Sequence, residues 1–207
     1  MLECCGESGY ARVSVQRVLE RSGCSRSRFY RLFANKSECF RLAYEEEANA
    51  LAERLLGHCR EGGSWRDGVV AAFAELGEYL CEQPLRARAL ILEVHVAGGA
   101  AFQFRDSLFS RFAKALDGAR SERSTSRYPP PPLAATFMVS TIDTAVAAVL
   151  SNDEPASFAT TALPSLLFVL DSAYFGEDAA DRYLSGDGGG AGRSPGRSPS
   201  PPPRRRQ

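Results

Sequence analysis

The chain of 207 residues has few of the residues on which catalytic and metal sites depend. Its two histidines, His58 and His95, lie far apart in the sequence, and the pair Glu93 and His95 alone is a weak metal motif. The sequence contains no nucleophile–base spacing and no Gly-rich phosphate loop between a strand and a helix. These absences argue against an enzyme, and we expect no catalytic residue, no cofactor and no metal.

The cysteines also lack the spacing of a metal or redox motif. The six are Cys4, Cys5, Cys24, Cys39, Cys59 and Cys81, and no two of them form a CxxC pair. A disulfide framework is not expected without secretion. We predict that they pack as small apolar side chains. A redox-sensing thiol, which requires exposure, is the alternative.

Long uncharged apolar runs are almost absent. Only residues 133–150 approach the length of a membrane-spanning helix, and no signal peptide is evident at the start. Asp143 and several hydroxyl side chains within that segment argue against a bilayer. We therefore expect a cytoplasmic protein with no membrane partner.

Acidic residues are missing from residues 24–37, CSRSRFYRLFANKS. This segment carries Arg26, Arg28, Arg31 and Lys36 between aromatic residues. Surface helices are usually supported by pairs of opposite charge, and like charges four residues apart repel each other. The formal net charge of the whole chain is zero, so acidic residues elsewhere balance a positive N-terminal block. Such asymmetry indicates a polyanion as partner of that block.

Short helices separated by tight turns are predicted near the N-terminus. Ser14 and Ser25 are the expected N-caps of two of them, and Gly23 lies in the turn between. A longer helix is expected to start near Ser37. This spacing is typical of a helix-turn-helix, whose second helix lies in the major groove of DNA.

The apolar positions of the second short helix indicate which side packs inward. Phe29, Leu32 and Phe33 repeat at i, i+3 and i+4, and we predict that they form its inner stripe. The longer helix that follows is expected to fade between Gly57 and Gly63.

Residues 9–40, GYARVSVQRVLERSGCSRSRFYRLFANKSECF, resemble the DNA-binding domain of the TetR family of bacterial transcriptional regulators. In that family Gly-Tyr closes helix one, Thr or Ser caps helix two, and a recognition helix ends Tyr-x-x-Phe with a Lys shortly after it. The matching residues here are Gly9-Tyr10, Ser14, Ser22-Gly23-Cys24-Ser25, Phe29-Tyr30-Arg31-Leu32-Phe33 and Lys36. The resemblance implies an all-α fold. It also implies an N-terminal DNA-binding domain of residues 1–45, with the helix-turn-helix at about 14–33.

The resemblance and the residue types together predict the DNA contacts. Arg26 and Arg28 begin the recognition helix, where an arginine can bind guanine through two hydrogen bonds, and we expect one of them to do so. The other predicted residues cap a helix or match family positions that touch phosphates. The full predicted set is Ser14, Ser25, Arg26, Ser27, Arg28, Tyr30, Arg31 and Lys36. The alternative is that the arginines form only a solvated face.

Three departures from the family pattern affect these expectations. Position 27 is commonly Gly and position 28 commonly Thr, whereas this chain has Ser27 and Arg28, which changes the bases that could be read. The family's helix one usually begins several residues before the position of Met1, so we expect a truncated helix one. This truncation leaves an alternative function, a helical dimeric ligand- or partner-binding protein with impaired DNA binding.

A second helical domain is expected at residues 46–184. Helical spacing of apolar residues predicts a helix from Trp65 to about Leu80, one from Pro84 to Gly98, and one from Ala101 to Leu116. Residues 119–132 are expected to be a loop.

Two later segments, residues 133–150 and 155–175, are apolar nearly all round. Helices of this kind are buried, and a small domain has little room for two of them. We predict that they form a four-helix interface in a homodimer, an arrangement that the TetR resemblance also implies. The alternative is that both are simply core. Pro164 is expected to kink the second helix.

The resemblance implies that a small effector in the second domain releases the DNA. A pocket lined by Trp65, Phe73, Tyr79, Phe102 and Phe109 would suit an apolar or aromatic effector. Residues 185–207, rich in Gly, Ser, Pro and Arg, are expected to be disordered. The sequence thus predicts a homodimeric repressor that binds a pseudo-palindromic operator in double-stranded DNA.

Overall fold

The computed structural model describes residues 1–60, 64–123 and 131–175, and every regular element within them is helical. The α-helices are α1 (Leu2–Ser8), α2 (Val15–Ser22), α3 (Arg26–Leu32), α4 (Lys36–Arg60), α5 (Trp65–Glu82), α6 (Pro84–Arg88), α7 (Val94–Ala97), α8 (Gly99–Arg123), α9 (Ala134–Ser151) and α10 (Leu163–Phe175). A 3₁₀ turn (Tyr10–Arg12) follows α1, and π-helical segments (Ala89–Glu93 and Phe158–Ala162) precede α7 and α10. The predicted all-α fold is confirmed. The tail predicted at residues 185–207 lies outside the described residues.

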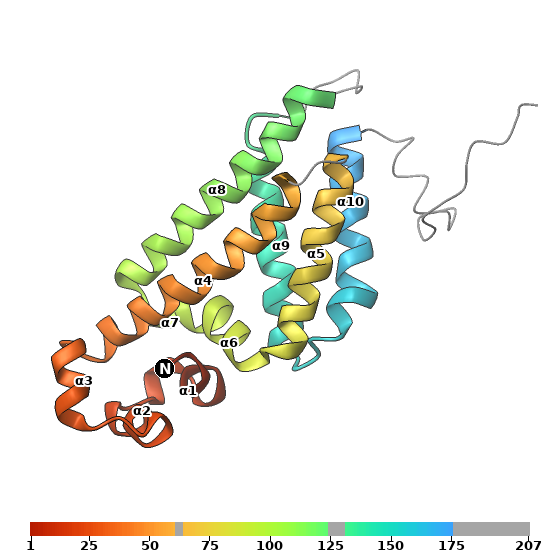
Figure 1. The fold of residues 1–207 in the computed structure, drawn as a ribbon. Helices are drawn as coiled ribbons and strands as arrows, with labels where there is room; N and C mark the ends of the chain where they lie inside the picture. Colours follow the sequence, from red (N-terminus) through yellow and green to blue (C-terminus); the bar gives the residue numbers. More distant parts are fainter. Residues whose placement is uncertain (61–63, 124–130, 176–207) are drawn as a thin grey trace, which may run out of the picture.

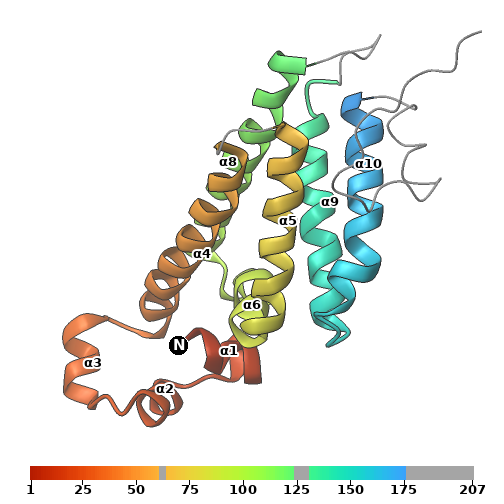
Figure 2. The same cartoon turned by 45° about the vertical axis from the view of Figure 1, so that its right-hand side comes forward.

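Helices α1, α2 and α3 form a small body at one end of the molecule, and α4 leads from it into the other helices (Figures 1 and 2). Ser14 caps α2 by accepting a hydrogen bond from the Arg17 backbone N–H at 3.2 Å. Ser25 caps α3 in the same way, accepting from the Arg28 N–H at 3.3 Å. Gly23 joins the two helices with φ 65°, a left-handed conformation that glycine adopts without strain. The predicted caps and turn are confirmed.

The predicted inner stripe of α3 is wrong at one position. Phe29 is buried and packs against Phe33, with ring centroids 5.1 Å apart. Leu32, however, is 57% exposed. It is the last residue of α3, and the chain leaves the helix at Phe33 with an extended φ of −137°. Because of this change of direction, Phe33 rather than Leu32 packs against the core.

Helix α1 is short but closely packed. Leu2, Cys4, Cys5 and Gly6 are buried. At Gly6 the helix approaches α6 so closely that an added Cβ would lie 1.9 Å from the Leu85 carbonyl oxygen. Only glycine fits at this contact, which fixes α1 against the larger helical body.

The cysteines of this region pack as predicted. Cys4 and Cys5 are fully buried, and Cys39 is 5% exposed. Burial raises the pKa of the Cys5 thiol to about 12, so that thiol stays protonated at neutral pH. A low-pKa sensor thiol is therefore excluded at Cys5.

Helices α4, α5, α8, α9 and α10 form the larger helical body. Helix α4 packs against α5 and α8, α8 packs against α9, and α9 packs against α10. In Figure 2, α5, α9 and α10 stand side by side, and α6 lies below them next to α1. Ala87 and Leu90, in the segment that runs from α6 to α7, are buried. This segment therefore contributes to the core of the larger helical body.

Helix α8 is longer than the predicted span of 101–116. It runs through Gly118 to Arg123, so the prediction of a loop at residues 119–132 is wrong for residues 119–123. Glycine inside a helix costs about 1 kcal/mol relative to alanine. The residues that follow include alanine, arginine and glutamate, which favour helix and offset that cost.

Pro164 lies at the second residue of α10. Proline has no N–H to donate, and its ring clashes with the preceding turn of an α-helix. The five residues Phe158–Ala162 just before α10 are π-helical, a wider turn of the kind that accompanies irregularities in helices. At the position of the predicted kink, the chain thus changes from a π-helix to the α-helix α10.

Candidate DNA-binding surface and effector cavity

Helix α3 is the recognition helix predicted from the sequence, and it presents most of its side chains to solvent. The exposed residues are Arg26, Ser27, Arg28, Tyr30 and Arg31. Phe29, only 2% exposed, anchors the helix from its inner side. The Arg26 guanidinium lies 5.7 Å from the centre of the Tyr30 ring, a cation–π distance. The helix therefore offers three cations and a phenol to a partner.

The three arginines of α3 form no ion pair within the part of the chain that the structure describes. Two arginines of α2 differ from them, because Arg17 pairs with Glu7 at 3.2 Å and Arg21 pairs with Glu3 at 3.0 Å. These α2 arginines belong to the same positive N-terminal part of the sequence. The structure shows that α1 neutralises them, so the unpaired positive charge is concentrated on α3.

Lys36 holds the start of α4 against the turn that follows α1. Its Nζ donates a hydrogen bond to the Tyr10 carbonyl at 3.0 Å and lies 4.2 Å from the centre of the Tyr10 ring. Lys36 is partly buried. The structure gives it a role in positioning the helix-turn-helix, and its predicted phosphate contact stays a prediction.

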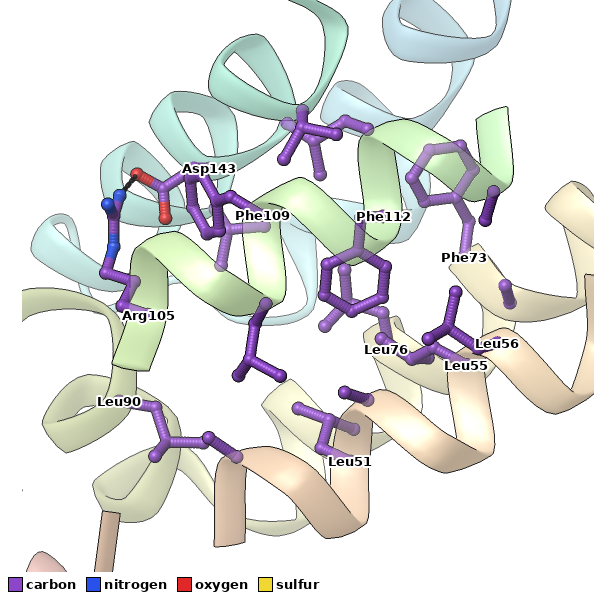
Figure 3. A pocket seen from close by; sticks show the side chains of 18 of the residues that line it. Leu51, Leu55, Leu56, Phe73, Leu76, Leu90, Arg105, Phe109, Phe112 and Asp143 are labelled. Carbon is purple, nitrogen blue, oxygen red and sulfur yellow. Dashed lines mark hydrogen bonds and ion pairs between the residues drawn. The ribbon is translucent and has the colours of Figure 1, made fainter. Parts of the chain in front are cut away.

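A cavity of about 180 Å³ lies within the larger helical body, between α4, α5, α8, α9 and the π-helical segment Ala89–Glu93. Apolar side chains from several helices converge on it (Figure 3). Representative lining residues are Leu51, Leu55, Phe73, Leu76, Phe109 and Phe112.

One end of this cavity is polar. Arg105 of α8 and Asp143 of α9 meet there, with Arg105 Nη2 2.5 Å from Asp143 Oδ2 (Figure 3). The Arg105 guanidinium also lies 4.0 Å from the centre of the Phe109 ring. Tyr44 of α4 lines the same cavity, and burial raises the pKa of its hydroxyl, so it stays protonated.

The structure brings only two of the five predicted ligand-binding residues to this cavity, namely Phe73 and Phe109. Trp65 packs against Tyr174, with ring centroids 5.3 Å apart. Tyr79 donates a hydrogen bond to Glu47 at 2.9 Å, and Phe102 lies against His95. These three aromatics have structural contacts away from the cavity.

The polar end of the cavity and its α4 wall were not among the sequence predictions. A signal for Arg105 was present, because it is a charged residue at helical spacing between Phe102 and Phe109. The α4 residues Leu51 and Leu55 also show helical spacing. No sequence pattern indicates that they face α8 rather than a partner.

The comparisons with known proteins agree with this geometry. The family described as bacterial regulatory proteins, tetR family, matches residues 2–43, which span α1, α2, α3 and the start of α4. This segment is similar to the DNA-binding domain of that family, as the sequence predicts, and the match supports a DNA-binding transcriptional regulator. Among curated proteins, none matches the sequence.

A solved structure with the same fold is that of the transcriptional regulator FadR from Bacillus subtilis in complex with stearoyl-CoA. The TM-score is 0.65 at 18% sequence identity, and the match covers 85% of this chain and 95% of the FadR chain. The likeness therefore extends through the helical body that contains the cavity, where it establishes the fold.

Ion pairs connect the helices of the N-terminal TetR-like segment to the larger helical body. Glu3 of α1 pairs with Arg86 of α6 at 3.3 Å, and Arg86 pairs with Glu47 of α4 at 3.0 Å. The Arg21 and Arg86 guanidiniums hold the pKa of Glu3 below its usual value. A second link joins the Tyr10 backbone N–H to Glu93 Oε2 at 2.6 Å.

Proposed function

We propose that this chain is a TetR-family repressor that binds a pseudo-palindromic operator in double-stranded DNA as a homodimer and is released by a small-molecule effector. The observation that carries the proposal is the exposed face of α3, whose three arginines form no ion pair in the described residues while the arginines of α2 do. Unpaired arginines lose hydration when they bind phosphates or bases but gain charge-assisted hydrogen bonds there. A recognition helix in the major groove uses this kind of surface.

The proposed roles follow the positions of the side chains. Arg26 and Arg28 in the first turn of α3 reach base edges, and one of them binds guanine. The neighbouring residues Ser27, Tyr30, Arg31 and Lys36 contact bases or the DNA backbone. Ser14 and Ser25 hold the two helices in shape through their caps.

The dimer is proposed to form through α9, the π-helical segment Phe158–Ala162 and α10. Helix α9 is long and apolar enough to cross a membrane by length and composition, and only 33% of it is buried. The outward residues of both helices carry no charge within the described part of the chain. In α9 they are Thr136, Phe137, Ser140, Thr141, Thr144, Ala148 and Ser151, and in the π-helical segment Phe158–Ala162 together with α10 they are Ala159, Thr160, Thr161, Pro164, Ser165, Phe168 and Val169. Phe137 is 65% exposed and Val169 is 44% exposed. An uncharged face of small and aromatic side chains suits close packing against a second copy.

Release by an effector is proposed to pass through the π-helical segment Ala89–Glu93. Leu90 and Ile91 of this segment line the cavity, and Glu93, at its end, binds the Tyr10 N–H of the DNA-binding region. An occupant that displaces Leu90 or Ile91 is proposed to move Glu93 as well, because the three residues lie on the same π-helical turn. The occupant must bind the DNA-incompetent state more tightly, and DNA must then weaken its binding equally.

The proposal includes the two domains expected from the sequence, residues 1–45 for DNA and 46–184 for the effector and the dimer. It places the protein in the cytoplasm, where it meets DNA, and assigns it no catalysis.

The alternative of impaired DNA binding through a truncated helix one is disfavoured. Helix α1 is buried against α6 and supplies Glu3 and Glu7 as partners for α2.

The test is fluorescence anisotropy of the full chain with DNA from its own upstream region, and with a scrambled duplex of the same composition as control. We expect tight binding to the first duplex alone, with an affinity that falls steeply as salt rises because phosphate contacts release counterions. Equally weak binding to both duplexes would refute the proposed function.

A further inference from the structure

The polar end of the cavity contains two buried atoms whose hydrogen-bonding capacity is unused. Arg105 is 8% exposed and joins Asp143 through a contact between Nη2 and Oδ2. An arginine–carboxylate pair often forms two parallel hydrogen bonds. Here Arg105 Nε and Asp143 Oδ1 are buried and have no hydrogen-bond partner among the residues that the structure describes. One donor and one acceptor are therefore left at the polar end of the cavity, each covered by neighbouring protein atoms, so an occupant reaches them only by displacing those atoms.

Unpaired buried polar atoms are destabilising and are rare in folded proteins. Apart from the pair itself, the polar residues of the lining are Tyr44 and Cys59, and all the others are apolar. An occupant that satisfies both unused atoms needs a group that accepts one hydrogen bond and donates another. The rest of the occupant must be apolar, because it lies against Leu, Ile, Val, Ala and Phe side chains.

The charges of the lining decide against an ionic occupant. Arg105 and Asp143 are its charged residues, and they neutralise each other. A carboxylate or phosphate would face the Asp143 oxygen, and an ammonium group would face the Arg105 guanidinium. Neither would find an uncompensated partner in the described lining, so its desolvation would not be offset.

The volume sets the size of the occupant. At about 180 Å³, the cavity is slightly larger than the engineered apolar cavity of roughly 150 Å³ that holds benzene. It suits a single ring with a short substituent, or a chain of similar volume. A long acyl chain with a nucleotide head, like the stearoyl-CoA in the FadR structure, is far larger.

We propose that the cavity binds a small uncharged alcohol or phenol with an apolar body. Its hydroxyl oxygen accepts a hydrogen bond from Arg105 Nε–H, and its O–H donates to Asp143 Oδ1. The inference rests on the proposed function in one respect only, namely the effect of the bound alcohol or phenol on DNA affinity. Binding of the compound itself is measured without DNA.

The experiment is isothermal titration calorimetry of the full chain with three probes that share an ethylphenyl body, namely 4-ethylphenol, ethylbenzene and 4-ethylbenzoate. We expect 4-ethylphenol to bind at least tenfold more tightly than ethylbenzene, because it alone satisfies both polar atoms. 4-Ethylbenzoate should bind more weakly than the phenol, since its charge faces Asp143. Equal affinities of the phenol and ethylbenzene, or tighter binding of the benzoate, would overturn the inference.

A double variant separates the polar contacts from the cavity itself. Arg105→Met with Asp143→Leu replaces a buried ion pair by apolar side chains of similar size, a change that proteins often tolerate. We expect the tenfold preference for the phenol to disappear while ethylbenzene still binds. Retained binding of ethylbenzene shows that the cavity has survived, and a retained preference for the phenol would contradict the proposed hydrogen bonds.

Anisotropy with operator DNA distinguishes this inference from the proposed function. Binding of 4-ethylphenol with release of DNA supports both. Binding of the phenol with unchanged DNA affinity supports the hydroxyl site and rejects effector release. Failure of all three probes to bind rejects the hydroxyl site while leaving DNA binding to be judged by the operator experiment alone.

Discussion

The exposed surface of α3 and the proposed dimer face on α9 and α10 differ in their charge. On α3, arginines stand exposed without a counter-charge in the described residues, although acids of α1 pair with the arginines of the neighbouring α2. On the outer faces of α9 and α10, no side chain that the structure describes carries a charge. The charged residues of those two helices point inward, where Asp143 pairs with Arg105 and Asp171 pairs with Arg66.

This difference indicates what each surface meets. A partner that supplies negative charge is best met by cations that no internal acid neutralises. A second copy of the same uncharged face is best met by small apolar and hydroxyl side chains, because any charge would be buried on association without a partner. The four predictions below challenge or refine this comparison, from the largest expected effect to the smallest.

Replacing the anchor of α3 should have the largest effect. Phe29→Ala removes a side chain that is 2% exposed, and we expect it to lower the free energy of unfolding by about 3–5 kcal/mol. Leu32→Ala, on the same helix but 57% exposed, is the matched control and should change it by less than about 0.5 kcal/mol. Chemical denaturation measures both, and similar losses would mean that Leu32 belongs to the core after all.

A charge on the proposed dimer face should dissociate the dimer. Phe137→Glu buries a carboxylate without a partner at the interface, and we expect it to weaken association by about 3 kcal/mol or more. Val96→Glu, at a residue that is 58% exposed on α7, introduces the same charge away from that face and should leave the dimer intact. Sedimentation velocity gives both outcomes. A Phe137→Glu chain that remains dimeric would move the interface elsewhere.

Removing one recognition arginine should weaken and relax DNA binding. Arg28→Ala is expected to cost about 1–3 kcal/mol on the operator if Arg28 binds guanine, and Arg26→Ala should then cost less. Arg60→Ala removes an exposed arginine at the far end of α4 and serves as control. Anisotropy against operator duplexes with single base changes measures the effect. If both α3 variants lose affinity equally on all duplexes, neither arginine reads bases.

The ion pairs of Glu3 should add a small pH-dependent term to stability. Arg21, through a hydrogen bond, and Arg86 hold the pKa of Glu3 below its usual value. A carboxylate with a lowered pKa stabilises the fold above the unfolded pKa of about 4.3, and this stabilisation is lost as the pH falls through the folded-state pKa. Because Glu3 is partly exposed, we expect at most about 1 kcal/mol.

The variant that tests this term is Glu3→Gln. Between pH 6 and about pH 3 its stability should decline less than that of the parent chain, as thermal unfolding in low salt can show. Glu78→Gln removes an exposed carboxylate of α5 away from this network and provides the comparison. A Glu3→Gln profile that parallels the parent would mean that these ion pairs contribute no net stability.

The helix-turn-helix could be predicted nearly in full from the sequence. Its elements are held by contacts over short sequence distances, such as Ser25 with the Arg28 N–H and Gly23 between two helices. Local rules govern such contacts, because caps and left-handed glycines act within a few residues. The error at Leu32 arose at a helix end, where periodicity no longer decides which side chain faces the core.

The sequence predicted an apolar cavity with aromatic side chains in the second domain, but not most of the residues that line it. Phe73 and Phe109 were found because aromatic residues at helical spacing indicate an inner face. Trp65, Tyr79 and Phe102 have the same pattern but pack elsewhere, since the direction in which each helix presents its face depends on how the bundle is assembled. The pairing of Arg105 with Asp143, 38 residues apart, has no local signal at all.

The sequence by itself determined the all-α fold, the helix-turn-helix with its caps, and the arginines of the recognition helix. These depend on residue type and short-range spacing. Tertiary structure alone decided which arginines stay unpaired, which aromatics line the cavity, and which faces of α9 and α10 remain exposed to solvent. These depend on distant segments meeting, because a side chain's charge balance and burial are set by its neighbours in space rather than in the chain.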